Sequence, residues 1–463
     1  MESKPAWPLG VSARPRPPSR GKASAAEPAP GVAARTIATA LYSDVLDRNQ
    51  PFDALTDRAG GNAPYLALPP RDRRLVHAIV ATALRRNGEI SVALDRFIEK
   101  KLPRRTGCLK RALEIAATQI LFMEVADHAV VSVALEQIGA DKDARHFKGL
   151  ANAVLRRLAR ERDQLRANFD PPRLDTPDWL WQRWSATYGE TTTRRIAEAH
   201  LVEPSLDLTV KSDPEKWAER LGGIVLPGGS VRLVPAGPIE ELPGFAEGEW
   251  WVQDAAAALP ARLLGPVAGK QVADLCAAPG GKTATLAHAG AKVTAVDISA
   301  ARLTRLRANL TRLKLDAETI CANILDWAPD ERFDAILLDA PCSATGTIRR
   351  HPDIAHLKRA QDIVSLAGLQ ERMLDRVVGL LKPGGILLYC TCSLEPEEGE
   401  YQFKRMCART DLKALPIEST EIGNFTDAIT PSGTVRTLPS QIPAENARLG
   451  GLDGFFMGRW QKD

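Results

Sequence analysis

Residues 271–283 read QVADLCAAPGGKT, and this stretch decides the fold expected for the C-terminal part of the chain. The apolar run 271–275 predicts a short strand, and the small residues after it lead into a predicted helix. Alanine and glycine at such a junction let the backbone approach a ligand, with the first helical amides pointing at it. A phosphate-binding Walker A loop would need glycine where Cys276 stands, and the GxGxxG spacing of nicotinamide-binding enzymes is absent. Strands and helical stretches alternate from about residue 250 onward, which predicts a parallel α/β sheet.

A second predicted strand, residues 292–296, ends at Asp297, sixteen residues after Gly281. An acid at the end of the second strand is placed to accept hydrogen bonds from a ribose diol. The glycine-rich loop alone is a weak signal. Loop and acid together predict a cofactor that contains a nucleoside.

Two further predicted strands end in residues capable of chemistry. Residues 335–338 run into Asp339 and then Cys342, and residues 385–389 run on to Cys392. Ligands in such sheets bind outside the carboxyl ends of strands, so both cysteines are expected to face one crevice. A single cysteine is usually a small buried hydrophobe. That inert interpretation is kept for Cys108, Cys321, Cys390 and Cys407.

The 463 residues are enough for about three domains of roughly 150 residues each. Composition predicts a multidomain chain: a disordered basic tail over 1–34, an all-α helical domain over 35–165, a small α+β connector over 166–250, and a Rossmann-like α/β domain over 251–463. In the helical part, apolar residues share faces at 75, 76, 79, 80 and 83 and at 150, 154, 155 and 158.

The formal net charge of +4 hides an asymmetry. Residues 1–35 carry +4, residues 36–170 carry +5, and residues 171–463 carry −5. A basic run is usually a solvated helix face, but three clusters in one basic domain favour a nucleic-acid-binding surface. The clusters are Arg71, Arg73, Arg74, Arg85 and Arg86; Lys100, Lys101, Arg104, Arg105, Lys110 and Arg111; and Arg156, Arg157 and Arg160.

Composition also excludes several classes of protein. No stretch approaches the roughly 18 to 20 apolar residues of a membrane-spanning helix, and residues 1–35 contain no apolar signal segment. The seven cysteines lack CxxC pairs and the histidines are scattered, so neither a disulfide framework nor a metal site is expected. We therefore expect a cytoplasmic protein with free thiols, without membrane or metal.

The runs DLCAAPGGKT (274–283), AVDIS (295–299), LLDAPCSATGTIRRHPDI (337–354), YCTCSLEPEEGE (389–400) and DGFFMGRW (453–460) carry a resemblance. They are similar to the RNA cytosine-5 methyltransferases of the Sun/Fmu (RsmB) type, within the NOL/NOP/Sun superfamily. Residues 68–87 and 148–162 resemble the NusB-like RNA-binding domain at the N-terminus of this subgroup. The resemblance covers residues 36–463, and its two cysteine motifs make it specific.

The resemblance implies S-adenosyl-L-methionine (SAM) as cofactor, with Asp297 at its ribose. Relatives usually have an aspartate near the adenine where this chain has Asn323, whose amide oxygen can still accept a hydrogen bond. Asp326 is the alternative contact. The implied cofactor-binding residues are Cys276, Ala277, Ala278, Pro279, Gly280, Gly281, Lys282, Asp297, Asn323 and Asp339.

The resemblance also implies catalytic roles for Cys392, Cys342 and Asp339. C5 of cytosine is a poor nucleophile, and a Cys392 thiolate adding at C6 makes an enamine whose C5 can take a methyl group. Cys342 then assists release of the adduct as C5 loses its proton, and Asp339 hydrogen-bonds the base edge near N3. Lys282 either belongs to an electropositive pocket that favours the Cys392 thiolate or is simply a helix-start lysine.

Two neighbouring segments receive smaller assignments. Arg349 and Arg350 suit phosphate contacts, as does His351, although a lone histidine is more often structural. Residues 253–256 are expected only to pack against the cofactor loop.

Together these features predict methyl transfer from SAM to C5 of a cytosine in RNA, with unassembled or looped 16S rRNA as substrate and the protein acting as a monomer. A target base must leave any helix to reach the thiol. Two alternatives stay open: a methyltransferase acting on tRNA, and a non-catalytic RNA-binding factor for assembly or antitermination on a vestigial SAM fold. A nicotinamide dehydrogenase is disfavoured by the missing GxGxxG motif.

Overall fold

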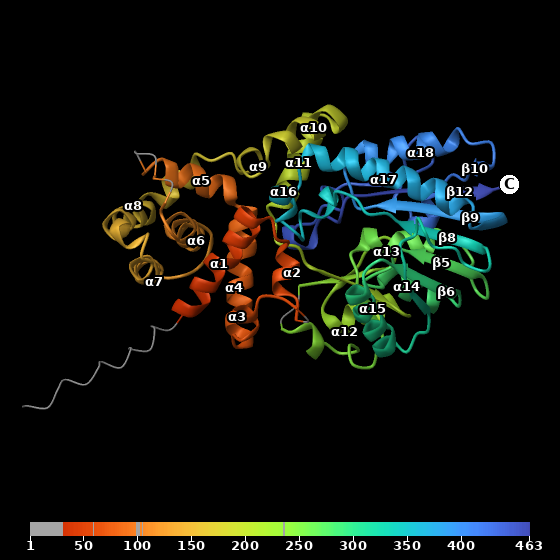
Figure 1. The fold of residues 1–463 in the computed structure, drawn as a ribbon, viewed down its shortest axis with the longest axis horizontal. Helices are drawn as coiled ribbons and strands as arrows, with labels where there is room; N and C mark the ends of the chain where they lie inside the picture. Colours follow the sequence, from red (N-terminus) through yellow and green to blue (C-terminus); the bar gives the residue numbers. More distant parts are fainter. Residues whose placement is uncertain (1–30, 59, 99–101, 104, 235–236) are drawn as a thin grey trace, which may run out of the picture.

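The computed structural model describes residues 31–463 except 59, 99–101, 104 and 235–236, so most of the predicted tail lies outside the described residues. A helical domain and an α/β domain lie at opposite ends of the molecule, with α9, α10, α11 and α16 between them (Figure 1). No helix among the described residues is long and apolar enough to cross a membrane.

The N-terminal part is all-α and has one core. Helix α1 starts inside the segment predicted as tail, and α8 runs two residues past the predicted boundary at 165. The helices are α1 (Val32–Arg48), α2 (Phe52–Thr56), α3 (Ala63–Leu66), α4 (Pro70–Arg85), α5 (Asn87–Asp95), α6 (Leu109–Phe122), α7 (Asp127–Ala140) and α8 (Lys148–Ala167), with a short 3-10 helix η1 (Arg145–Phe147).

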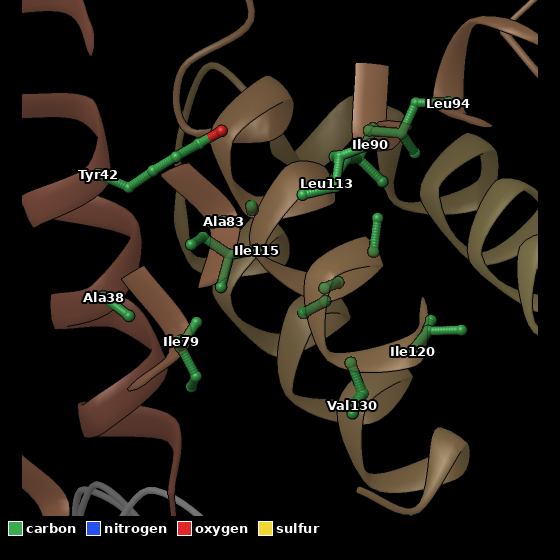
Figure 2. Close-up of a cluster of buried hydrophobic side chains, with 14 of the residues drawn as sticks. Ala38, Tyr42, Ile79, Ala83, Ile90, Leu94, Leu113, Ile115, Ile120 and Val130 are labelled. Carbon is green, nitrogen blue, oxygen red and sulfur yellow. The ribbon is translucent and has the colours of Figure 1, made fainter. Parts of the chain in front are cut away.

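The apolar faces predicted for this domain form its core. Val76, Ile79 and Ala83 of α4 are fully buried, and Figure 2 shows Ile79 and Ala83 beside side chains from α1 and α6. Val154, Leu155 and Leu158 of α8 are buried too. Leu150 is an exception, because it is 36% exposed at the start of α8.

The connector consists of a helical part and a small antiparallel sheet. Helix α10 is rich in tryptophan, and Leu180 and Trp184 are its buried side chains. The strand order is β2-β3-β1-β4. The elements are α9 (Pro171–Leu174), α10 (Asp178–Tyr188), α11 (Glu190–His200), β1 (Leu206–Val210), α12 (Pro214–Leu221), β2 (Ile224–Val225), β3 (Val231–Leu233), η2 (Ile239–Glu241) and β4 (Trp250–Val252).

The C-terminal part contains the predicted Rossmann-like sheet. Its strand order is β10-β12-β9-β8-β5-β6-β7, with β9 to β7 parallel, β12 and β10 antiparallel, and β11 paired with β12. The elements are α13 (Ala255–Arg262), β5 (Gln271–Leu275), α14 (Gly281–His288), β6 (Lys292–Asp297), α15 (Ala300–Leu313), β7 (Glu318–Cys321), β8 (Phe333–Asp339), η3 (Thr345–Thr347), α16 (Ile354–Leu357), α17 (Ala360–Val378), β9 (Leu381–Thr391), η4 (Pro396–Glu398), α18 (Glu400–Cys407), β10 (Leu412–Ala414), η5 (Ser419–Ile422), η6 (Thr426–Ala428), β11 (Val435–Thr437), η7 (Ala447–Leu449) and β12 (Phe455–Lys462).

Both faces of this sheet are covered, which explains why its central strands read as continuous apolar runs. Alternate residues of β8 point to opposite faces. Ile336 and Leu338 pack with α17 and α18, whereas Ala335 and Leu337 pack with α13 and α14. The order reverses between β5 and β8, so a ligand crevice is expected at the carboxyl ends of these strands.

The helical domain is tied to the segment that follows Cys342. Arg85 at the end of α4 donates to the carbonyl oxygens of His200 at 2.7 Å and Arg349 at 2.9 Å. The amide of Phe52 donates to Asp353 Oδ2 at 2.9 Å. Helices α2 and α4 therefore lie against the part of the chain that leads from Cys342 into α16 (Figure 1).

Candidate active site

The two predicted cysteines meet at the carboxyl edge of the sheet. Cys342 follows β8 and Cys392 follows β9, its parallel neighbour, and their Sγ atoms are 3.5 Å apart. Both thiols are free and half-buried. The hydrogen bond with Cys392, together with burial, raises the pKa of the Cys342 thiol well above its ordinary value.

Asp339 lies at the end of β8, where two side chains hold its carboxylate. Lys282 Nζ donates to Asp339 Oδ2 at 2.8 Å, and Cys390 Sγ lies 3.5 Å from Oδ1. The Lys282 side chain is only 10% exposed. Burial alone would lower the pKa of Lys282, but the Asp339 charge and hydrogen bond raise it, so the cation is kept. Lys282 and the buried Cys390 thus both contact the Asp339 carboxylate.

The loop between β5 and α14 is anchored by Asp297 at the end of β6. The Asp297 carboxylate is 1% exposed and accepts from the amides of Ala278 at 3.2 Å and Ser299 at 2.9 Å. Arg302 pairs with it at 3.2 Å and also donates to the Ala278 carbonyl. Sequence analysis missed Arg302, since nothing in the α15 sequence separates it from its arginine neighbours.

Gly280 ends this loop with φ +102°, in the left-handed region that favours glycine. A Cβ there would lie 2.8 Å from Leu306 Cγ on α15. The loop therefore packs tightly on α15 behind the position where helix α14 begins. On its other side Gly281 lies beside Gln253, because a Cβ on Gly281 would be 3.1 Å from Gln253 Nε2.

Asn323 and Asp326 lie side by side beyond the end of β7. Asn323 Nδ2 donates to Asp326 Oδ2 at 2.6 Å, and both residues are exposed. The two alternatives for the adenine contact thus form one polar pair. Ile298 directly follows Asp297 at the end of β6, and 71% of its surface is exposed.

Asp274 is a buried acid of β5 that sequence analysis missed. Its side chain is 0% exposed and accepts from Thr283 Oγ1 at 2.5 Å, while Oδ1 has no partner among the described residues. Burial raises the pKa of Asp274 to about 7, against the opposing effects of Thr283 and Lys282. The sequence of β5 does not show whether its single acid points into the core or toward solvent, so this buried carboxyl could not be predicted.

The structure corrects the smaller assignments around Cys342. Arg349 is 2% exposed and pairs with Asp254 at 3.0 Å, so the predicted phosphate contact is wrong for this residue. Arg350 directs Nε to Asp453 at 2.8 Å, and His351 Nδ1 lies 3.0 Å from Asp53. Asp254 therefore does more than pack against the loop, because it also accepts from the Ala256 amide at the start of α13.

The predicted nucleic-acid-binding surface is also partly corrected. Arg86 pairs with Glu89 at 2.9 Å and Arg111 with Glu114 at 2.7 Å, and Arg85 is held at the domain junction. Lys100, Lys101 and Arg104 lie outside the described residues. The predicted basic residues that are exposed are Arg71, Arg74, Arg105, Lys110, Arg156, Arg157 and Arg160.

No group of three or more histidine, cysteine, aspartate or glutamate side chains in the described part of the chain could hold a metal ion.

Two family models match the chain. Residues 261–459 match the 16S rRNA methyltransferase RsmB/F family, and residues 32–160 match the NusB family. The chain is 38% identical over 360 residues to the ribosomal RNA small subunit methyltransferase B of Vibrio cholerae, covering 74% of this chain and 82% of the relative. The chain belongs to the RsmB/F methyltransferase family. The protein of the same name from Pasteurella multocida is 34% identical over 92% of this chain and 96% of its own length.

Solved structures agree with this RsmB/F assignment at the level of the fold. The structure of PH0851 has a TM-score of 0.70 at 22% identity and covers 94% of this chain and 99% of its own. A methyltransferase homolog from Pyrococcus horikoshii has a TM-score of 0.51 at 29% identity, over 65% of this chain and 97% of its own. The predicted family and fold class, a NusB helical domain followed by a Rossmann-like methyltransferase domain, are therefore confirmed.

Proposed function

We propose that this RsmB/F protein methylates C5 of a cytosine in 16S rRNA, using SAM, through a covalent bond between Cys392 and C6. The observation that carries the proposal is the 3.5 Å approach of Cys342 Sγ and Cys392 Sγ beside Asp339. The names of the relatives from Vibrio cholerae and Pasteurella multocida support ribosomal RNA as the substrate. The proposal includes a cytoplasmic enzyme that acts as a monomer on unassembled or looped RNA.

The residues at the sheet edge fit SAM. Residues 276–282 form a tight loop, the Asp297 carboxylate is held at the end of β6 by two amides and Arg302, and Ile298 offers an exposed apolar surface for a flat ring. The polar pair Asn323 and Asp326 supplies acceptors for an exocyclic amine. In this proposal SAM supplies an electrophilic methyl group.

Cys392 acts first. Its thiolate adds to C6, the C5–C6 double bond opens, and the electron density gained at C5 makes that carbon nucleophilic. As the bond to C6 forms, N3 takes up a proton from solvent, and the Asp339 carboxylate accepts a hydrogen bond from the resulting N3–H. Lys282 keeps the Asp339 carboxylate in place through its 2.8 Å ion pair.

Cys342 acts in release. After C5 has gained its methyl group, its proton must leave, the C5–C6 double bond re-forms, and the Cys392 thiolate departs. Cys342 lies 3.5 Å from the departing sulfur: its thiol gives its own proton to the Cys392 sulfur as the C6–S bond breaks and takes up the proton that leaves C5, so that both thiols end protonated.

The helical domain and its exposed arginines would hold RNA through phosphates. The target cytosine leaves any helical stack to reach the two thiols, because a thiolate adds to C6 from the face of the ring, and stacked bases cover that face inside a duplex.

A direct test uses labelled SAM and in vitro transcripts of 16S rRNA and of tRNA. Wild-type protein should label the 16S transcript. Cys392→Ala should abolish labelling while SAM binding, measured by calorimetry, is unchanged. Cys342→Ala should accumulate a protein–RNA adduct that survives a denaturing gel. Full activity of Cys392→Ala would refute the mechanism, and labelling of tRNA alone would refute the substrate.

A further inference from the structure

Glu398 is a buried carboxylate between the two cysteine loops. It ends η4, just beyond the Cys392 loop, and its side chain is 0% exposed. Its carboxylate accepts from Ser393 Oγ at 2.5 Å, from the Ser343 amide at 2.9 Å and from Ser343 Oγ at 2.5 Å. Ser343 follows Cys342 and Ser393 follows Cys392, so one carboxylate holds the residue next to each thiol.

Every one of these contacts suits an ionised carboxylate. The partners of the Glu398 carboxylate are an amide, two hydroxyls and Gln370 Nε2 at 3.2 Å, and all of them donate. Burial raises the pKa of Glu398, and the hydrogen bonds from Ser343 and Ser393 oppose that effect. A buried charge is costly unless it is fully hydrogen-bonded, so the hydrogen bonds from these two serines stabilise the Glu398 carboxylate in its buried position.

The backbone of Glu398 is fixed to the sheet as well. Its carbonyl oxygen accepts from Tyr389 OH at 2.7 Å and from Thr391 Oγ1 at 3.1 Å. Tyr389 and Thr391 belong to β9, the strand that directly precedes Cys392. The side chain thus joins the two loops while the main chain is anchored to the strand below them.

We propose that Glu398 is a positioning residue that sets the distance and orientation of Cys342 relative to Cys392. This inference rests on the proposed function, because it assigns Glu398 a part in the same two-thiol reaction. Glu398 makes no hydrogen bond to either Sγ atom and is linked to the two cysteine loops through Ser343 and Ser393, while its charge contributes to the raised pKa of the Cys342 thiol.

The reaction depends on this geometry. Cys392 must reach C6 while Cys342 serves the neighbouring carbon C5, so the two sulfurs have to approach adjacent atoms of one ring. Each loop alone is a short irregular segment after a strand. A displacement of about 1 Å in such a site lowers the rate by about 100-fold.

The test compares Glu398→Gln with Glu397→Gln in the full chain. Gln keeps the volume at 398 but removes the charge and turns one acceptor into a donor. Glu397 is the matched control, since it lies in the same η4 helix and pairs with Arg183 at 2.7 Å near the surface. Ser343→Ala and Ser393→Ala each remove the hydroxyl link from one loop.

The first readout is the single-turnover rate constant for adduct formation on the 16S transcript in the Cys342→Ala background, expressed per SAM-binding site. Glu398→Gln and Ser393→Ala should lower it roughly 10- to 100-fold. The dissociation constants for SAM and RNA should stay within about 2-fold, and Glu397→Gln should leave all three quantities unchanged. A purely structural role would reduce the number of SAM-binding sites but not the rate constant per site.

The second readout is turnover with Cys342 present. Glu398→Gln and Ser343→Ala should lower kcat with KM for RNA unchanged. Unchanged rate constants in Glu398→Gln and in both serine variants would overturn the positioning role. If the wild type transfers no methyl group and Cys342→Ala traps no adduct, the proposed function itself fails, which is a separate result.

Discussion

Replacing Asp274 by Asn should change how the stability of the α/β domain depends on pH. The Asp274 carboxyl is 0% exposed, and burial raises its pKa to about 7 from an ordinary value of 3.8. Between these two values the folded state holds a proton that the unfolded state has released. Stability from this group is therefore highest at low pH and falls as pH rises toward 7.

The magnitude follows from the pH interval. From pH 5 to pH 7 the loss accumulates over two pH units at ~1.36 kcal/mol per unit, which amounts to about 3 kcal/mol, and above pH 7 it levels off. Asp274→Asn has no such proton to lose. The free energy of unfolding of the wild type, relative to Asp274→Asn, should therefore fall by about 3 kcal/mol between pH 5 and pH 8.

The assay is urea denaturation of the full chain at both pH values, followed by pulsed hydrogen–deuterium labelling of the β5 peptides. Asp334→Asn is the control, and its difference from the wild type should stay constant between these two pH values. The hydrogen bond from Lys382 and that from the Gln271 amide lower the pKa of Asp334, so its stabilisation is present at neutral pH and lost as pH falls below 3.8. A wild-type to Asp274→Asn difference that stays constant within about 0.5 kcal/mol from pH 5 to pH 8 would refute the reasoning.

Three further predictions concern the loop, the domain junction and RNA. Gly280→Ala should destabilise the protein by about 1–3 kcal/mol and weaken SAM binding, because φ is +102° and the new Cβ would meet α15. The control is Gly290→Ala, where φ is +84° and the nearest contact of the new Cβ is 3.5 Å. It should lower stability by about 1 kcal/mol and leave the SAM affinity measured by calorimetry unchanged. Arg85→Met removes two hydrogen bonds to carbonyl oxygens across the domain junction and should lower the free energy of unfolding by about 2 kcal/mol. The loss should be seen as faster proteolysis between the domains, and an unchanged cleavage rate would contradict it. Replacing the exposed Arg156 and Arg160 by Ala should weaken binding of the 16S transcript and reduce the slope of log affinity against log salt by about one per arginine, and an unchanged slope would count against the helical domain as the RNA-binding surface.

The sequence predicts the ends of the central strands well, for a physical reason. Parallel strands buried on both faces are continuous apolar runs, so the polar residue that follows each run marks the edge of the sheet. That is why Asp297, Asp339, Cys342 and Cys392 could be assigned to one edge without any structure.

Ion pairs across the chain could not be predicted in the same way. Arg349 meets Asp254 across 95 positions and Arg350 meets Asp453 across 103, and nothing local distinguishes these arginines from phosphate-binding ones. Glu398 stands in a run with Glu395 and Glu397, and only the three-dimensional structure separates the buried carboxylate from its more exposed neighbour at 397.

The junction at Arg85 has a consequence for target choice. The helical domain is hydrogen-bonded to Arg349 and Asp353, which follow Cys342 in the chain, so the distance from its exposed arginines to the two sulfur atoms is fixed. Under the proposed function, an RNA held by these arginines would present to the two thiols a nucleotide at a fixed distance along the RNA. The position of a cytosine relative to that contact would then decide whether it is methylated.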